Sequence, residues 1–309
     1  MVIPLCINLL IFITKFVSPL KEKKHTCVVF CDISKAFDRV WHRGLVEKLK
    51  AYGISGELLT WLKHYLSGRY QKVFLNSTYS SQGLIEAGVP QGSILGPLLF
   101  LIFINDIADI FESTSRLFAD DTSLLKSSSS CQEIQLTLNR DLETLNTWSK
   151  TWLVNFNPDK TDVLFISNST DIEQDIDLEF DGKVLNFTDY HKHLGVTFNS
   201  NAKWGDHVNG IYSSAMKKIN VLRKLKHLIS RDALLKIYKT FILPILEYAC
   251  ELWDGCNVIE SEKLEKAQRE AIRIILGLPS YTPVNSLYFE SGLETLSSRR
   301  KRKKTSSIV

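Results

Sequence analysis

Two adjacent carboxylates lie at the centre of a short apolar segment, and they limit what this chain can fold into. Residues 117–125 form two apolar arms on either side of Asp120-Asp121, which is the pattern of a hairpin. Hairpin turns favour Asn-Gly or Asp-Gly, because those residues tolerate positive φ. Two neighbouring carboxylates in apolar surroundings also repel each other. We therefore expect a turn with a chemical role, and the alternative is a solvated surface turn.

A third carboxylate ends a second apolar segment. Residues 26–31 are apolar and partly β-branched, so they predict a buried strand that ends on Asp32. Two divalent cations about 3.5–4 Å apart can hold the attacking and leaving oxygens of an in-line phosphoryl transfer. Mg²⁺ prefers carboxylates together with substrate phosphates. Asp32, Asp120 and Asp121 are therefore candidate ligands for such ions, provided that the fold brings them together.

The segments around these acids predict a mixture of helices and strands. Residues 88–97, rich in glycine and proline, lead into residues 98–104, which are apolar on every side and predict a buried helix. Residues 131–152 have the single apolar stripe of an amphipathic helix. Residues 177–185 have a hairpin pattern that turns at Asp181-Gly182. We also expect helices at residues 44–52 and 56–66, and strands at residues 71–75, 83–87 and 163–167.

Near residues 199–206 the spacing of apolar residues changes, and beyond this point it predicts helices alone. The fold class is therefore α+β, an antiparallel sheet backed by helices and followed by an α-helical region. Helical spacing recurs in residues 208–229, 232–252 and 259–277. We expect four parts: a leader or linker at residues 1–25, the sheet domain at 26–200, the helical region at 201–298 and a basic tail at 299–309.

Charge and cysteine content narrow the classes of function. The net charge is +4, but six cations lie in residues 299–304, and without them the chain would stand at 4 − 6 = −2. This run could bind nucleic acid or act as a nuclear localisation signal, but a disordered tail is the default expectation. The six cysteines include no Cys-x-x-Cys pair, so neither a secreted disulfide framework nor a zinc module is indicated. A reducing compartment, cytoplasmic or nuclear, is the expectation.

The N-terminal residues 2–13 are mostly apolar. This run is shorter than the roughly 17–25 residues of a membrane helix, and no basic start precedes it, as a secretory signal would require. We expect a buried or disordered leader, with membrane attachment as the lesser alternative.

Five segments in a fixed order resemble the motifs of one family. Asp32-Ile-Ser-Lys-Ala-Phe-Asp, Gly88-Val-Pro-Gln-Gly-Ser-Ile-Leu-Gly-Pro and Phe118-Ala-Asp-Asp resemble motifs A, B and C of reverse transcriptases of non-LTR (LINE-like) retrotransposons, especially the jockey-like group. Asn157-Pro-Asp-Lys-Thr resembles motif D, and His191-Lys-His-Leu-Gly-Val resembles motif E, the primer grip. The resemblance covers roughly residues 26–300. It implies a polymerase palm followed by a helical thumb and C-terminal region.

The resemblance also implies roles for particular residues. Asp32, Asp120 and Asp121 match the metal-binding carboxylates, and Lys160 matches the motif D lysine proposed as a general acid for pyrophosphate. The other matches are Phe37 at the steric gate that favours deoxynucleotides, Gln91 and Gly92 in the nucleotide pocket, and His193, Leu194 and Gly195 at the primer grip.

Plainer interpretations remain open for several of these residues. Phe37 could be an ordinary core side chain, and Lys160 could be a surface charge. The cations of residues 217–226 could face a phosphate backbone or only solvent. His191 and His193 are poor metal-ligand candidates, because no third ligand stands at a useful spacing.

The implied activity is RNA-directed DNA polymerisation by two-metal nucleotidyl transfer. The expected cofactors are two Mg²⁺ ions, with Mn²⁺ as a substitute, and the expected partners are an RNA template, a DNA primer and deoxynucleoside triphosphates. We expect no obligatory protein partner and no membrane.

The segments that resemble the family do not include the fingers region, which precedes motif A in complete enzymes. The residues before Asp32 do not resemble the fingers motifs, so we expect a chain truncated before the palm, with exposed apolar surface where fingers would pack. Two alternatives to an active polymerase therefore stand. One is a catalytically inert remnant, and the other is a recruited nucleic-acid-binding protein.

Overall fold

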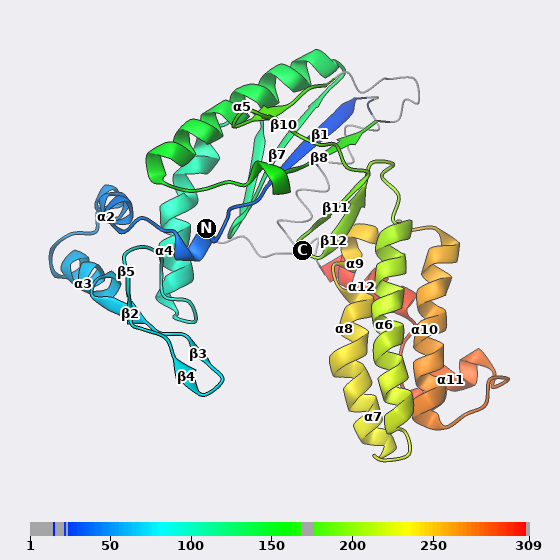
Figure 1. Ribbon diagram of the computed structural model, residues 1–309. Helices are drawn as coiled ribbons and strands as arrows, with labels where there is room; N and C mark the ends of the chain where they lie inside the picture. The colour runs from blue at the N-terminus through cyan, green and yellow to red at the C-terminus, as the bar shows by residue number, and fades with distance from the viewer. Residues whose placement is uncertain (1–14, 16–21, 23, 168–175, 307–309) are drawn as a thin grey trace. The chain divides into compact units, whose positions relative to one another are not determined.

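The chain folds into two compact units, one ending at Thr188 and the other beginning at Asp189. The computed structural model describes residues 15, 22, 24–167 and 176–306 (Figure 1). The apolar run at residues 2–13, and with it the expected leader, lies outside the described residues. Within the described residues, no helix has the length and apolar character needed to cross a membrane.

The first unit is built on a four-stranded antiparallel sheet. The strand order is β6-β7-β1-β8, and every neighbouring pair is antiparallel. Every residue of the central strand β1 is buried, so the predicted buried strand is confirmed. The bounds of the strands are His25–Cys31 for β1, Thr114–Phe118 for β6, Asp121–Ser128 for β7 and Asp162–Ile166 for β8.

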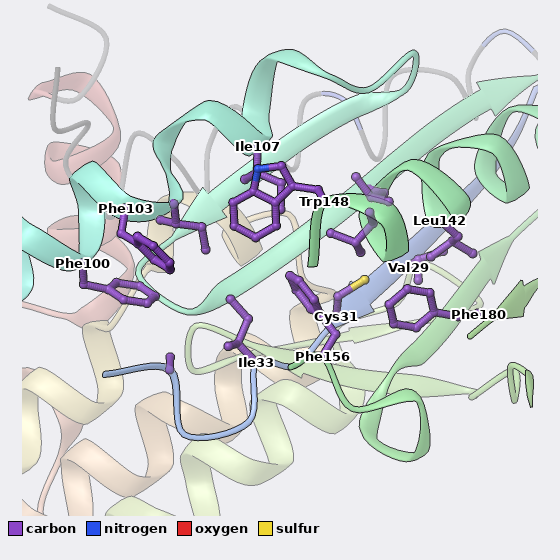
Figure 2. Close-up of a cluster of buried hydrophobic side chains, with 14 of the residues drawn as sticks. Val29, Cys31, Ile33, Phe100, Phe103, Ile107, Leu142, Trp148, Phe156 and Phe180 are labelled. Carbon is purple, nitrogen blue, oxygen red and sulfur yellow. The ribbon is translucent and has the colours of Figure 1, made fainter. Parts of the chain in front are cut away.

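The long helix α5, Cys131–Trp152, covers this sheet (Figure 1) and has the bounds that its apolar stripe predicts. Its first turn is capped, because the side chain of Ser130 accepts a hydrogen bond from the backbone N–H of Glu133. Leu142 and Trp148 of this helix belong to the same buried cluster as Val29 of β1 (Figure 2). The core therefore lies between α5 and the sheet.

The apolar helix α4, Leu95–Ile104, is buried on one side only. Leu99 and Phe103, four residues apart, are buried, whereas Ile94 is 95% exposed and Leu98 is 51% exposed. The prediction of burial on every side is wrong, because composition shows that each face is apolar but not which neighbour covers it. The sheet unit therefore has an exposed apolar face at this helix.

Two helices and a strand ribbon precede α4. The helices α2, His42–Ala51, and α3, Gly56–Leu66, agree with the predicted ones to within about two residues. The ribbon pairs β2 with β5 and β3 with β4 (Figure 1). Its strands are Arg69–Gln71, Phe74–Leu75, Thr78–Tyr79 and Gly83–Ile85.

A hairpin follows α5 in the sequence. Its strands are β9, Glu179–Phe180, and β10, Lys183–Val184. Asp181 and Gly182 between them both have positive φ, as a tight hairpin turn requires, so the predicted turn is confirmed.

The second unit begins with a hairpin and continues in helices. The hairpin pairs β11, Tyr190–His193, with β12, Val196–Asn199. It contacts the helical region directly, because the Thr197 N–H donates to Nδ1 of His207 in α6 at 3.2 Å and the hydroxyl of Tyr248, which follows α8, donates to Leu194 O at 2.7 Å. The division therefore falls before this hairpin, not at residues 199–206, where the change of pattern placed it.

The helices of the second unit pack around their own apolar core. The predicted helix 232–252 is interrupted, because Pro244 has no N–H and would clash with the carbonyl four residues earlier in a regular helix. A π-helical turn at Tyr238–Ile242 precedes it. The helices are α6 Gly205–Leu225, α7 Arg231–Ile237, α8 Leu243–Glu247, α9 Cys250–Trp253, α10 Val258–Leu276, α11 Val284–Ser291 and α12 Leu296–Ser306.

The basic run expected as a tail lies in α12 and is largely paired. Glu247 forms ion pairs with Arg299 and with Lys303, the latter at 3.0 Å. Asp254 pairs with Arg300 at 3.4 Å and with Lys304 at 3.5 Å. Arg302 also pairs with Glu294 at 2.6 Å. The run therefore packs through five of its cations against three acids of its own unit, and the expectation of a disordered tail is wrong through Ser306.

Candidate active site

The three candidate acids lie at one end of the sheet. The register of β1 against β7 pairs Cys31 with Thr122, so the next residues outward, Asp32 and Asp121, follow that pair at the same end. Asp120 lies in the turn between β6 and β7, where Phe118 pairs with Asp121. The structure therefore gathers segments that are far apart in the sequence.

The turn itself differs from the sequence expectation. Its two central residues are Ala119 and Asp120, and Asp121 is already the first residue of β7. Ala119 has φ of 54°, a left-handed conformation that an L-residue with a Cβ adopts at a cost of about 1–2 kcal/mol. Strain of this kind persists where the surrounding structure fixes the backbone, and it is frequent at functional sites.

The segment that resembles motif D is bound to Asp32 through the backbone. The Asn157 N–H donates to Asp32 O at 2.9 Å, and the Ser34 N–H donates to Asn155 O at 2.8 Å. Between these bonds, Ile33 and Phe156 form an isolated β-bridge. The start of motif D therefore lies beside the residue that carries the first carboxylate.

Lys160 follows at the end of a short 3₁₀ turn, Pro158–Lys160. The side chain of Asn157 caps this turn by accepting from the Asp159 N–H at 3.0 Å. Lys160 Nζ lies 3.8 Å from Asp32 Oδ2, and both side chains are partly exposed. An exposed pair of this kind contributes little to stability. What matters is its place, because it puts an ammonium group beside the carboxylate of Asp32.

The glycine-rich segment that resembles motif B packs on the turn that follows Asp32. The Gly88 N–H donates to Val40 O and the Val89 N–H donates to Phe37 O, both at 2.8 Å. Gly88 has φ of 91°, and a Cβ on it would lie 2.7 Å from the carbonyl oxygen of Asp38. Only glycine fits this close approach of two backbones.

The two predicted nucleotide-pocket residues lie next on this segment, and both are exposed. Gln91 Nε2 donates to Asp38 Oδ1 at 2.8 Å, which joins the segments of motifs A and B through side chains. Gly92 has φ of 78°, and nothing lies within 4 Å of the position that a Cβ would take. The backbone of Gly92 is therefore open to a ligand.

Phe37 is half-buried, and its ring lies 4.7 Å from that of Phe100, measured between centroids. The ring therefore has a packing role in the core and still keeps part of its surface accessible. Both interpretations of this residue, gate and core, are compatible with that position.

The predicted primer-grip residues lie in the second unit. Leu194 and Gly195 form the β11–β12 turn, and both have positive φ, as a tight hairpin turn requires. A Cβ on Gly195 would lie 3.0 Å from Tyr248 Cε1, so glycine is also needed for packing there. His193 is buried, and this burial, followed by the nearby His191, lowers its pKa to about 4. Its ring is therefore neutral at pH 7.

Sequence reasoning missed two side chains that support these segments. Asp38, the acceptor for Gln91, closes the motif A segment. The buried ammonium of Lys48 donates to Phe103 O at 2.5 Å and to Asp106 Oδ1 at 2.6 Å, and it lies 3.7 Å from the centre of a Trp152 ring. These contacts tie α2 to α4 and to the end of α5. An apolar pattern gives no signal for a lysine inside it.

His207 of α6, in the Trp204-x-x-His207 segment that resembles the family's thumb, is a further supporting side chain and is buried. Burial, followed by the positive charge of Lys192, lowers its pKa to about 4. Its Nδ1 accepts from a backbone N–H, so the proton of the neutral ring lies on Nε2, which is buried with no hydrogen-bond partner among the described residues. The rings of Trp204 and Trp253 flank this imidazole.

The chemistry of the carboxylates fits a hard divalent cation. Carboxylate oxygens from two adjacent strand ends are the donors that Mg²⁺ prefers, and Asp32 already has a cation, Lys160, 3.8 Å away. No three His, Cys, Asp or Glu side chains in the described part of the chain lie close enough together to hold an ion as they stand. Binding would therefore have to draw the side chains of Asp32, Asp120 and Asp121 inward.

Comparison with known proteins identifies the family of the chain. Residues 11–198 match the family described as "Reverse transcriptase (RNA-dependent DNA polymerase)". The chain is 31% identical over 292 residues to a probable RNA-directed DNA polymerase from transposon BS of Drosophila melanogaster, covering 89% of this chain and 32% of the relative. It is 31% identical to the RNA-directed DNA polymerase from mobile element jockey of Drosophila funebris, covering 85% and 30%. The chain thus spans about a third of the length of these relatives.

The solved structures support the fold. Telomerase from Candida albicans, in complex with a fragment of telomeric RNA, matches 94% of this chain and 54% of its own, with a TM-score of 0.50 and 12% identity. Apo telomerase from Candida tropicalis matches 88% and 45%, with the same TM-score and identity. At this identity the likeness concerns the polymerase fold. Proteins of this family use divalent metal ions, in keeping with the three carboxylates at the end of the sheet. By its matched sequence and its fold, the chain belongs to the reverse transcriptase family, and its relatives include the jockey-type mobile elements that its motifs resemble.

Proposed function

We propose that this chain carries the catalytic part of an RNA-directed DNA polymerase, which extends a DNA primer on an RNA template. One observation carries the proposal: Asp32 of motif A and the Asp120-Asp121 pair of motif C lie at the same end of an antiparallel sheet. Family membership agrees with this chemistry, and the names of the relatives state it for those proteins. The two units would serve as the palm and as the thumb with the C-terminal region.

Asp32, Asp120 and Asp121 would hold two Mg²⁺ ions, with Mn²⁺ as a substitute. Such ions stabilise the charge on the attacking and leaving oxygens of nucleotidyl transfer. Lys160 beside Asp32 would steady phosphate charge and donate a proton to the departing pyrophosphate.

Metal binding has a readout that does not depend on activity. An ion that binds only the folded chain raises its unfolding free energy by about 2.7 kcal/mol at a hundred times the dissociation constant. We expect Mg²⁺ to raise the melting temperature of the wild type, and not that of an Asp120→Asn, Asp121→Asn variant. The same rise in both proteins would place the ion elsewhere.

The incoming deoxynucleoside triphosphate would lie over the segment of Gln91 and Gly92. The open backbone at Gly92 allows close approach, and the bond from Gln91 to Asp38 fixes the segment against the turn that carries Phe37. The exposed part of the Phe37 ring would then exclude a ribose 2′-OH. The turn of Leu194 and Gly195, held by Tyr248, would support the primer end, with the neutral ring of His193 packed behind it.

The decisive experiment is primer extension on an RNA template with Mg²⁺ and deoxynucleotides. An Asp120→Ala, Asp121→Ala variant should give no product, while an Asp232→Ala, Glu290→Ala variant, which removes two exposed acids of the second unit, should extend like the wild type. Both variants should keep the far-UV circular dichroism of the wild type. Absence of extension by folded wild-type protein would refute the proposal for this chain.

A further inference from the structure

An acid-free segment of the sheet unit exposes cations. No residue between Glu57 and Glu86 is acidic, although the segment includes Lys63, Arg69 and Lys72. All three are exposed, and neither Lys63 nor Lys72 forms an ion pair with any residue in the described part of the chain. The segment runs from α3 through the β2–β5 ribbon (Figure 1). Its positive charge is therefore uncompensated locally.

The same segment exposes four aromatic rings. Trp61 is 52% exposed, Tyr70 and Phe74 are each 58% exposed, and Tyr79 is 67% exposed. Phe74 and Tyr79 face each other across β3 and β4, with centroids 4.7 Å apart. Rings that leave more than half of their surface in water forgo most of the gain from burial. They are available to stack on a ligand.

A pocket of about 370 Å³ between α2 and α3 adjoins this segment. Its cations include Arg43 and Lys63, and its acid, Glu47, is already paired with Lys50 at 2.8 Å. Arg43 lies in the first turn of α2, where free backbone N–H groups and the helix dipole favour an anion. The pocket therefore suits a phosphate group.

The pocket also connects to the proposed active site through one residue of its wall. His42 lines the pocket, and its Nε2 is hydrogen-bonded to Gly88 O of the motif B segment at 2.7 Å. A strand held in the pocket would thus lie against the segment proposed to receive the nucleotide.

We infer that the pocket and the exposed ribbon form a binding surface for single-stranded nucleic acid, called here the basic–aromatic surface. It comprises Arg43 and Lys63 of the pocket, Lys72 of the ribbon, and the exposed rings of Trp61, Tyr70, Phe74 and Tyr79. A partner protein would be expected to meet a surface with charges of both signs. Uncompensated cations beside exposed rings instead match the phosphates and bases of an unpaired strand. The inference rests on the proposed function only for the class of ligand, since the carboxylates take no part in this binding.

Equilibrium binding of a labelled unstructured RNA, oligo(U), and of oligo(dT) to the full chain tests the inference. Stacking contributes to affinity without counterion release, so a Trp61→Ala, Phe74→Ala, Tyr79→Ala variant should raise the dissociation constant at least about fivefold per ring and leave the salt dependence unchanged. A Lys63→Gln, Lys72→Gln variant should lower the slope of log K against log salt concentration by about 1.4, or about 0.7 per cation.

Matched controls come from the second unit. Tyr281 and Phe289 are each 85% exposed, and a Tyr281→Ala, Phe289→Ala variant should bind like the wild type. A Lys236→Gln, Lys239→Gln variant should keep the wild-type slope. Equal losses in the test and control variants would overturn the inference, because binding would then follow total charge and aromatic content. It would also be overturned if the aromatic variant lost self-association in sedimentation velocity and bound both oligonucleotides normally.

The proposed function and this inference fail separately. An Asp120→Asn, Asp121→Asn variant should lose primer extension and keep its affinity for oligo(U). The wild type could extend a primer while the aromatic and lysine variants bind oligo(U) as the wild type does. This result would support the proposed polymerase function and contradict the basic–aromatic surface.

Discussion

At the scale of single residues, the clearest candidate for functional strain is Ala119. Its left-handed φ of 54° places a Cβ where glycine would carry no steric cost. Ala119→Gly should raise the unfolding free energy by about 0.5–1 kcal/mol, because the relief of strain exceeds the added entropy of the unfolded chain. It should also slow primer extension, because a looser turn positions Asp120 less well.

Urea unfolding and single-turnover extension measure the two effects. Ala202 gives a matched control, since it has φ of 55° and belongs to the second unit, whereas the proposed catalytic residues belong to the first. Ala202→Gly should stabilise without slowing extension. Faster extension by Ala119→Gly would show that the strained turn has no positioning role.

The two interpretations of Phe37 can be separated by substrate discrimination. If the exposed part of its ring excludes the ribose 2′-OH, Phe37→Val should raise the incorporation of ribonucleotides relative to deoxynucleotides about tenfold, equivalent to about 1.4 kcal/mol. Phe100→Leu disturbs the same ring contact from the core side. It should lower stability and leave the ratio of incorporation unchanged. A similar ratio in both variants would make Phe37 a core residue only.

At the scale of helices and strands, sequence pattern predicted most where one local signal sufficed. Helix α5 has its predicted bounds because a continuous apolar stripe begins just after a serine cap. The buried strand β1 and the turn at Asp181-Gly182 were likewise predicted from signals within their own residues. The break in residues 232–252 carried its own signal in Pro244, which a helical apolar pattern concealed.

The candidate site was predictable as residue types in order, and its supporting contacts were not. The motifs named Asp32, Asp120, Asp121 and Lys160, but nothing in their spacing showed which side chains hold the segments together. The bond from Gln91 to Asp38 depends on how two loops pack. Such contacts depend on tertiary structure and leave no periodic trace in the sequence.

The exposed side of α4 leads to a prediction about solubility. Ile94 and Leu98 lie four residues apart on this face and are 95% and 51% exposed. Contiguous exposed apolar surface promotes association. Leu98→Gln should therefore reduce concentration-dependent light scattering and change the unfolding free energy by no more than about 0.5 kcal/mol.

Leu99→Gln provides the contrast, because Leu99 is only 2% exposed on the opposite side of the same helix. That change should cost several kcal/mol by burying an unpaired amide. Undiminished scattering by Leu98→Gln would mean that another surface drives association.

At the scale of the whole molecule, stability should depend on pH through two buried histidines of the second unit. The pKa of His193 and that of His207 are both lowered to about 4, mainly by burial. An unfolded histidine has a pKa near 6.5, so between about pH 6.5 and pH 4 the unfolded chain binds protons that the folded chain does not. The contribution of these neutral rings to the free energy of unfolding is therefore fully present above about pH 6.5. It is lost as the pH falls toward 4, by up to about 3 kcal/mol for each residue.

His207→Asn should reduce this pH dependence by about half, because asparagine does not titrate and its Oδ1 can still accept the Thr197 N–H. Urea unfolding of the wild type and the variant at intervals from pH 7 to pH 4.5 measures the effect, read from the transition of the helical unit. His227→Asn, which changes an exposed histidine of the same unit, should keep the wild-type dependence. Equal slopes in all three proteins would show that the buried imidazoles do not govern the acid sensitivity of this unit, and that its carboxylates do.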